Sequence, residues 1–71
     1  MSATLRLHRK LYTASALRVA TEAFSELATI AMEHEKEHYS LTFSAIAPDV
    51  QDVLVREFAN YALAETIESR R

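Results

Sequence analysis

Residues 38–46 read HYSLTFSAI, and this stretch decides the fold. Tyr39, Leu41 and Phe43 alternate strictly with polar residues, which is typical of a strand with one buried and one solvent-facing side. Polar-out alternation is the ordinary pattern of an antiparallel sheet that is covered on one face only. We therefore predict that residues 38–46 form the central strand of a small, one-sided sheet.

The residues before this strand predict its hairpin partner. Residues 30–35 also alternate, and the segment that joins the two runs is charged. Because the joining segment contains neither glycine nor asparagine, a tight two-residue turn is disfavoured, and a longer type I loop at Lys36-Glu37 is expected. The alternative is that residues 30–37 continue the preceding helix.

The remaining elements follow from a change of hydrophobic period. Residues 4–12 begin with alternation, which predicts a strand that ends near Lys10. Residues 13–29 and 50–68 carry apolar residues at helical spacing, which predicts two amphipathic helices. Thr13 and Asp49 are the expected N-caps of these helices because their side-chain oxygens accept hydrogen bonds from free backbone N–H groups. Phe24 and Phe58 are expected in the core.

The order strand, helix, strand, strand, helix predicts a single small α+β domain over residues 1–71. We expect a three-stranded antiparallel sheet with two helices on one face, a ferredoxin-like unit that lacks its last strand. The first strand is then an uncovered edge that invites another strand. A proline in place of Leu7 is expected to remove backbone donors from that edge. The other face of the sheet is expected to be polar, with Arg6, His8, Glu33, Glu35, Ser40, Thr42 and Ser44.

Composition excludes several classes of function. The chain has 71 residues, no cysteine and no glycine, so disulfides, thiolate metal sites and glycine-rich phosphate loops are absent. No uncharged stretch approaches the roughly 20 apolar residues of a membrane-spanning helix, and residues 1–18 lack the apolar run of a secretory signal. Residues 1–18 hold four basic and no acidic residues, whereas the chain has a net charge of −2. This mixed charge argues against nucleic acid as a ligand, and we expect a cytoplasmic protein without a membrane association.

The segment His34-Glu35-Lys36-Glu37-His38 is a literal H-E-x-x-H. On a helix this spacing places two imidazoles on one face to bind zinc, with the first glutamate as general base of a hydrolase. Strict alternation begins at His38, so we expect the second histidine in a strand and the motif in a charged hairpin loop. The zinc-dependent hydrolase stays as a subordinate alternative.

Four residues are candidates for partner binding: Arg6, His8, Tyr12 and Asn60. His8 is surrounded by Arg6, Arg9 and Lys10, which suits an anion or an acidic peptide; the alternative is a solvated strand end. Asn60 is a poor interior helix residue because its side chain competes for backbone hydrogen bonds. It is expected either to contact a partner or to lie exposed at small cost.

Several short segments resemble HxsD proteins, the small D component of the bacterial His-Xaa-Ser peptide-maturation systems. The resemblance rests on residues 11–12, on 16–20 with Phe24, on the hairpin of residues 30–46 and on residues 57–63. The last segment is similar to the F-x-N-x-x-L helix of that family. The turn departs from the family pattern, because it carries charged residues where glycine or an aspartate-rich sequence is expected.

The resemblance implies an accessory role beside a radical S-adenosylmethionine enzyme and its precursor peptide. Tyr12, Phe58 and Asn60 are the more distinctive residues of this match. Together with the predicted open edge, the resemblance leads to the hypothesis of a non-catalytic module that binds a protein or peptide by β-augmentation. This module is expected to need no cofactor. The alternative hypothesis is a structural homodimer in which the edges of two copies pair.

Overall fold

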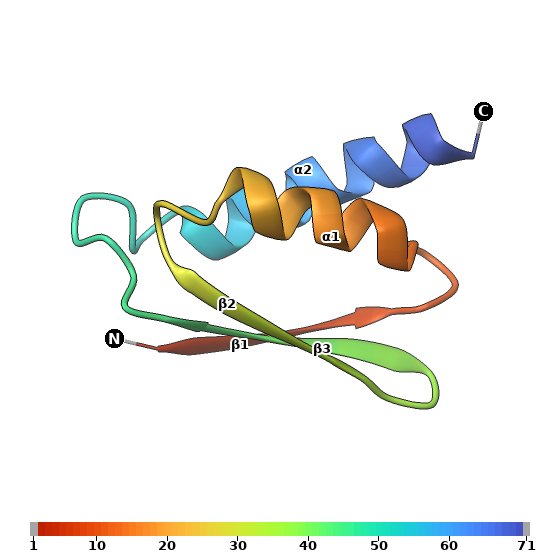
Figure 1. Ribbon diagram of the computed structural model, residues 1–71, viewed down its shortest axis with the longest axis horizontal. Helices are drawn as coiled ribbons and strands as arrows, with labels where there is room; N and C mark the ends of the chain where they lie inside the picture. The colour runs from red at the N-terminus through yellow and green to blue at the C-terminus, as the bar shows by residue number, and fades with distance from the viewer. Residues whose placement is uncertain (1, 71) are drawn as a thin grey trace.

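The computed structural model describes residues 2–70 and consists of one sheet covered by two helices (Figure 1). The elements in chain order are β1 (Ala3–His8), α1 (Ala14–Ala23), β2 (Thr29–His34), β3 (His38–Ser44) and α2 (Leu54–Ser69). β3 lies at the centre, antiparallel to both neighbours, in the strand order β1-β3-β2. The predicted α+β fold is therefore confirmed. Among residues 2–70, neither helix has the length and apolar character needed to cross a bilayer.

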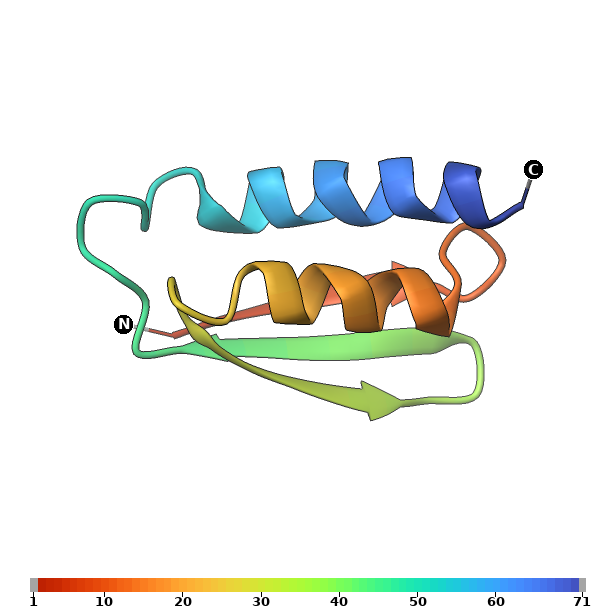
Figure 2. The same cartoon turned by 45° about the horizontal axis from the view of Figure 1, so that its top comes forward.

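The two helices divide the covered face of the sheet between them. α1 lies above β3 and β2, whereas α2 lies above and beyond β1 (Figure 2). The helices meet through aromatic side chains: the Phe24 ring packs edge-on against the rings of Phe58 and Tyr61, with centroids 5.4 and 5.6 Å apart. This arrangement leaves both outer strands, β1 and β2, as edges of the sheet.

The core lies between the sheet and the helices because the alternation of β3 sends three side chains to the covered face. Leu41 and Phe43 have no exposed surface, and Tyr39 is 5% exposed. Phe58 of α2 also has no exposed surface, and its ring packs edge-on against Phe43 at 5.1 Å. The aromatic chain from Phe43 through Phe58 to Phe24 therefore joins the sheet, α2 and the end of α1.

The first helix is shorter than predicted. Thr13 is its N-cap, as expected, because its hydroxyl accepts a hydrogen bond from the N–H of Ala16 at 3.2 Å. α1 ends at Ala23, however, and not at residue 29. The chain must become extended by Thr29 in order to pair with Ser44. Residues 24–27 form turns instead of helix.

The second helix begins later than predicted, at Leu54 and not at residue 50. Its N-cap residue is Val53, which provides no side-chain cap, so the prediction of Asp49 as N-cap was wrong. Residues 48–53 form turns in which the N–H of Val53 donates to the carbonyl of Val50 at 3.1 Å. The strands also end earlier than predicted, at His8 for β1 and at Ser44 for β3.

Thr66 is a buried polar residue that the sequence pattern did not single out. It is 1% exposed, and its hydroxyl donates to the carbonyl of Ala62 at 2.9 Å. The same oxygen accepts a hydrogen bond from the backbone N–H of Thr13 at 3.3 Å. Thr66 therefore ties the end of α2 to the start of α1.

Replacing Thr66 by valine is expected to lower the free energy of unfolding by about 1–2 kcal/mol. The shape is kept, but the part-buried N–H of Thr13 loses its acceptor, which costs more than the loss of an average hydrogen bond. Urea unfolding followed by circular dichroism measures the change. Thr21→Val is the matched control, because the Thr21 hydroxyl donates one turn back, to Leu17 at 2.7 Å, and within residues 2–70 no hydrogen bond links it to another element. Equal losses in the two variants would contradict the proposed tie.

Candidate functional site

Arg6 and His8 lie side by side on the open face of the sheet, as the alternation predicts. In the register of β1 with β3, Arg6 is opposite Ser40 and His8 is opposite His38. The Arg6 guanidinium donates from Nε and Nη2 to Oε1 of Glu35 at 3.2 and 3.0 Å. Both side chains are well exposed, at 60% and 44%, so this ion pair contributes little to stability. Arg6 remains accessible to an acidic group from a partner.

His8 and His38 form a pair of half-buried rings at one end of this face. Their centroids are 5.0 Å apart and the ring planes are inclined at 66°. The backbone N–H of Lys10 donates to Nδ1 of His8 at 3.1 Å. A neutral His8 therefore carries its proton on Nε2, because Nδ1 is the acceptor. The ring is held as a hydrogen-bond donor at Nε2.

The structure does not bring together the two histidines of the H-E-x-x-H segment. His34 ends β2 and packs edge-on against Tyr39, on the covered face, with ring centroids 5.2 Å apart. His38 begins β3 and faces the open side, where it meets His8. The zinc geometry needs both imidazoles on one face of a helix, so the segment does not form that site. Within residues 2–70, no three histidine or acidic side chains are grouped closely enough to hold a metal ion.

The free edge of β1 exposes backbone groups in a defined pattern. The N–H of Arg9 donates to the carbonyl of Glu37 at 2.9 Å. Residue pairs along two antiparallel strands alternate between hydrogen-bonded and non-hydrogen-bonded. Because Arg9 is in a hydrogen-bonded pair, Leu7, two residues earlier, also bonds to β3. Thr4 and Arg6 are in non-hydrogen-bonded pairs, so their N–H and C=O groups point away from β3. The prediction that a proline at Leu7 would remove edge donors was therefore wrong, because the N–H of Leu7 points inward.

An apolar stripe on α2 overhangs this edge. Phe58 and Tyr61 mark the side of α2 that meets α1. Val55, Ala59 and Leu63 follow one another along the helix about one third of a turn away from that side, so they lie on the part of α2 that is turned away from α1. Leu63 is 42% exposed and the other two are half-buried. Because α2 lies beyond β1 (Figure 2), a strand added beside β1 would lie below this stripe, and we call that position the slot.

The other two predicted binding residues lie elsewhere. Tyr12 is half-buried in the loop between β1 and α1 and packs against the core. Asn60 is exposed on α2, on the helix side of the sheet. The structure therefore brings together only Arg6 and His8 of the four candidates. The pattern missed His38 as the partner of His8, because a cross-strand pair depends on the register of the two strands.

The loop that follows β1 is held against the hairpin by Arg9. Its Nη1 atom donates to the carbonyl oxygens of Glu35 and Lys36 at 3.0 and 3.5 Å. Its guanidinium carbon lies 5.3 Å from the centre of the Tyr39 ring, which is within the range of a cation–π contact. Arg9 therefore fixes the end of the edge and is less available to a ligand than Arg6.

Comparison of the chain with models of protein families, with curated proteins and with solved structures found no match.

Proposed function

We propose that the protein is a non-catalytic binding module that accepts an extended peptide segment of a partner protein as a fourth strand beside β1. The observation that carries the proposal is the β1 edge. Thr4 and Arg6 present unpaired N–H and C=O groups there, which is the requirement for strand addition. A guest strand completes the sheet on the side that α2 overhangs.

The surroundings of the edge favour a particular guest. Side chains of a strand point alternately to the two faces of a sheet. One set would lie under Val55, Ala59 and Leu63 of α2, so it is apolar. The other set would lie beside Arg6 and the Nε2–H of His8, so it includes an acidic or carbonyl-bearing side chain. An alternating apolar and acidic segment fits both sides of the slot.

The resemblance to HxsD proteins suggests where such a segment comes from. A precursor peptide, or a radical S-adenosylmethionine enzyme that modifies it, is the partner that the resemblance implies. A module that holds an extended peptide beside its enzyme needs an edge strand and no catalytic group. We therefore propose an accessory role in peptide modification as the context of the binding.

Self-association through the same edge is the second candidate function. Two copies of β1 can pair antiparallel and bury the edge in a symmetric dimer. Arg6 lies in β1 and Arg9 and Lys10 follow it directly, so that pairing brings like charges together, which disfavours it. A tight dimer in light scattering that added peptide leaves unchanged would favour this candidate over peptide binding.

Peptides selected on the immobilised protein from a displayed random library test the proposal. We expect the selected peptides to alternate apolar and acidic residues, and we expect Arg6→Glu to weaken their binding about fivefold, the equivalent of about 1 kcal/mol for an exposed charge pair. Arg18→Glu is the matched control, because it makes the same change of charge on α1, on the far side of the molecule from β1. Binding that Arg6→Glu leaves unchanged would contradict the assignment.

A further inference from the structure

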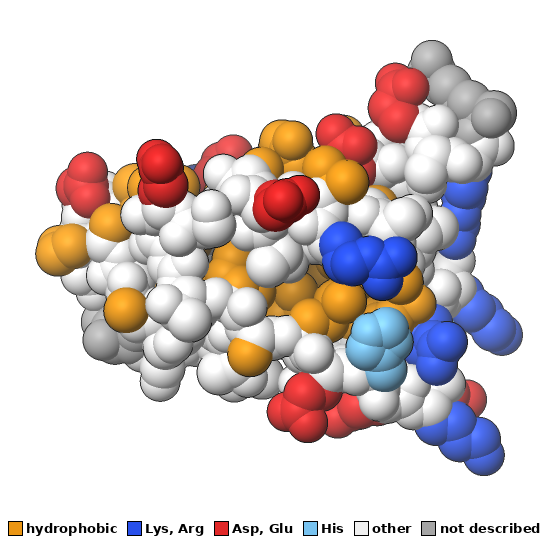
Figure 3. Space-filling model, viewed as in Figure 1, with side chains coloured by type: hydrophobic (Ala, Val, Ile, Leu, Met, Phe, Trp, Pro, Cys, Tyr) orange, Lys and Arg blue, Asp and Glu red, His pale blue; other side chains and the backbone are white. Residues whose placement is uncertain are grey.

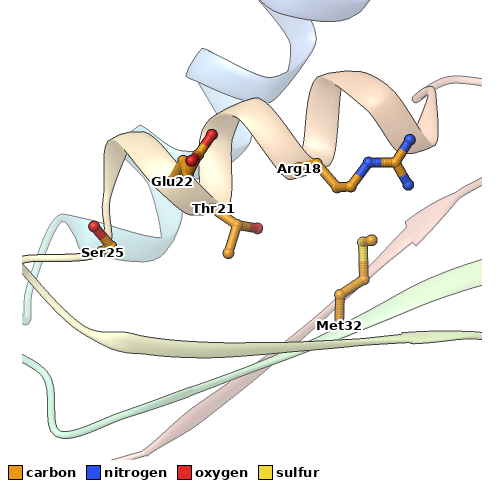
Figure 4. A pocket seen from close by; sticks show the side chains of 5 residues that line it. All are labelled: Arg18, Thr21, Glu22, Ser25 and Met32. Atoms are coloured by element: carbon orange, nitrogen blue, oxygen red, sulfur yellow. The ribbon is translucent and has the colours of Figure 1, made fainter.

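A second open groove lies on the opposite side of the molecule, between α1 and β2. It encloses about 500 Å³ and is lined by Arg18, Thr21, Glu22, Ser25 and Met32 (Figure 4). Arg18, Thr21 and Glu22 come from α1, Ser25 comes from the turn that follows it, and Met32 rises from β2 toward them. Hydrophobic side chains fill the hollow beneath the helix, and basic side chains and a histidine stand at one end (Figure 3).

The lower wall of this groove is a second free sheet edge. The N–H of Glu35 donates to the carbonyl of His38 at 2.8 Å, and alternation then directs the backbone groups of Ile30, Met32 and His34 away from β3. Their side chains lie on the covered face; Ile30 and Met32 are half-buried against the core. The outward backbone groups therefore belong to three residues, and two of these, Ile30 and Met32, carry apolar side chains.

The charges along the groove distinguish its two ends. Arg18 extends above Met32 toward the end of β2, and Ser25 lies at the end where β2 begins (Figure 4). Within residues 2–70 the Arg18 guanidinium has no ion-pair partner. His34 is exposed at the same end of β2, whereas Glu22 follows Arg18 by one turn of α1. The end near His34 therefore carries the Arg18 guanidinium, and the other end is acidic and hydroxyl-bearing.

We propose that this groove binds a second extended peptide segment, which pairs antiparallel with β2. Residues directly opposite each other in a pair point to the same face, so the guest residue opposite Met32 enters the groove and is apolar. The guest residue opposite His34 lies beneath Arg18 and is acidic. Antiparallel pairing is slightly more stable per residue than parallel pairing. This groove is independent of the β1 edge, so it makes the protein a module with two peptide sites.

The probe is the blocked peptide acetyl-Thr-Glu-Thr-Ile-Thr-Val-Thr-amide, which in antiparallel register places glutamate opposite His34, isoleucine opposite Met32 and valine opposite Ile30. It is titrated into ¹⁵N-labelled protein, and the backbone amide resonances are followed. We expect shifts at the amides of the three β2 residues and of Thr21. A second probe with lysine in place of glutamate is expected to bind about threefold to tenfold more weakly, which is the range of an exposed charge pair.

The variant Arg18→Glu completes the test by reversing the preference between the two probes. We expect it to weaken the glutamate probe about threefold to tenfold and to strengthen the lysine probe. Arg56→Glu is the control, because it makes the same change of charge at an exposed position of α2, outside the groove, and is expected to leave both affinities unchanged. Shifts confined to the amides of Thr4 and Arg6 would overturn the groove site and leave the β1 site standing. An absence of shifts at millimolar probe, self-association through β2, or affinities that do not respond to Arg18→Glu would each overturn the proposal.

Discussion

Phe58→Ala is expected to lower the free energy of unfolding by about 3–5 kcal/mol. Phe58 has no exposed surface, and its ring is held between those of Phe43 and Phe24, with centroids 5.1 and 5.4 Å away. Removal of a buried phenylalanine side chain costs about 3–5 kcal/mol, because the cavity collapses only in part. At about 0.05–0.15 kcal/mol per residue, a chain of 71 residues has a free energy of unfolding of about 4–10 kcal/mol. The substitution removes a large part of that margin.

Tyr61→Ala is the matched control for this loss. The Tyr61 ring also packs edge-on against Phe24, at 5.6 Å, but it is 37% exposed. We expect it to cost about 1 kcal/mol, because much of its surface is already in water. Urea unfolding monitored by circular dichroism compares the two variants with the parent chain. If the two aromatic side chains cost the same, Phe58 is not the link between the sheet and the two helices.

The topology of the fold was predictable because the strands have a period-two pattern that no helix shares. Alternation at Tyr39, Leu41 and Phe43 identified the central strand and its buried face together. The helix ends were not predictable from the same evidence. Phe24 and Leu27 keep helical spacing beyond α1, but the carbonyl of Leu27 instead accepts a hydrogen bond from the N–H of Ala47 at 2.8 Å. A contact between segments distant in sequence thus decides where the helix ends.

The start of α2 could not be predicted from a capping residue alone. Asp49 is a residue of the preferred capping type, yet the helix begins after Val53 without a side-chain cap. Leu54 and Phe58, which are buried at 1% and 0% exposure, set the face and the position of the helix. Packing of an amphipathic face contributes more to helix stability in a protein than a single cap does.

The candidate site was predictable only in part in its side chains, and its backbone was not predictable. Alternation assigned Arg6 and His8 to the open face, and the structure places them there. The direction of the N–H groups of β1 depends on which of its residue pairs with β3 are hydrogen-bonded. The alternation of side chains within one strand does not specify this. This is why Leu7, on the correct strand, was the wrong position for a test of the edge. The α1–β2 groove was missed for a related reason: Arg18 and Met32 are brought together only by the packing of the helix on the sheet.

Leu7→Pro and Thr4→Pro are expected to separate folding from edge binding. Leu7 is 7% exposed and sits in a hydrogen-bonded pair with Tyr39. A proline at Leu7 removes that hydrogen bond as well as a core side chain, at a combined cost of at least about 3 kcal/mol. We expect this variant to be unfolded by circular dichroism, which makes it uninformative about binding. A Leu7→Pro protein that folds as the parent does would contradict the assignment of the Leu7 N–H to the pair with β3.

Thr4→Pro changes the same strand at a position where the N–H points outward. Thr4 is exposed and forms a non-hydrogen-bonded pair with Thr42, and edge strands tolerate proline at such positions. We expect the variant to fold with a change of about 1 kcal/mol or less in unfolding free energy.

The Thr4→Pro variant loses one donor to the guest strand, which is worth about 0.5–1.5 kcal/mol. The proline ring also obstructs the approach of a guest strand, so selected peptides should bind at least about fivefold more weakly. A folded Thr4→Pro protein that binds them as the parent does would show that the guest does not pair with β1. Arg6 would then act on a ligand that lies across the open face.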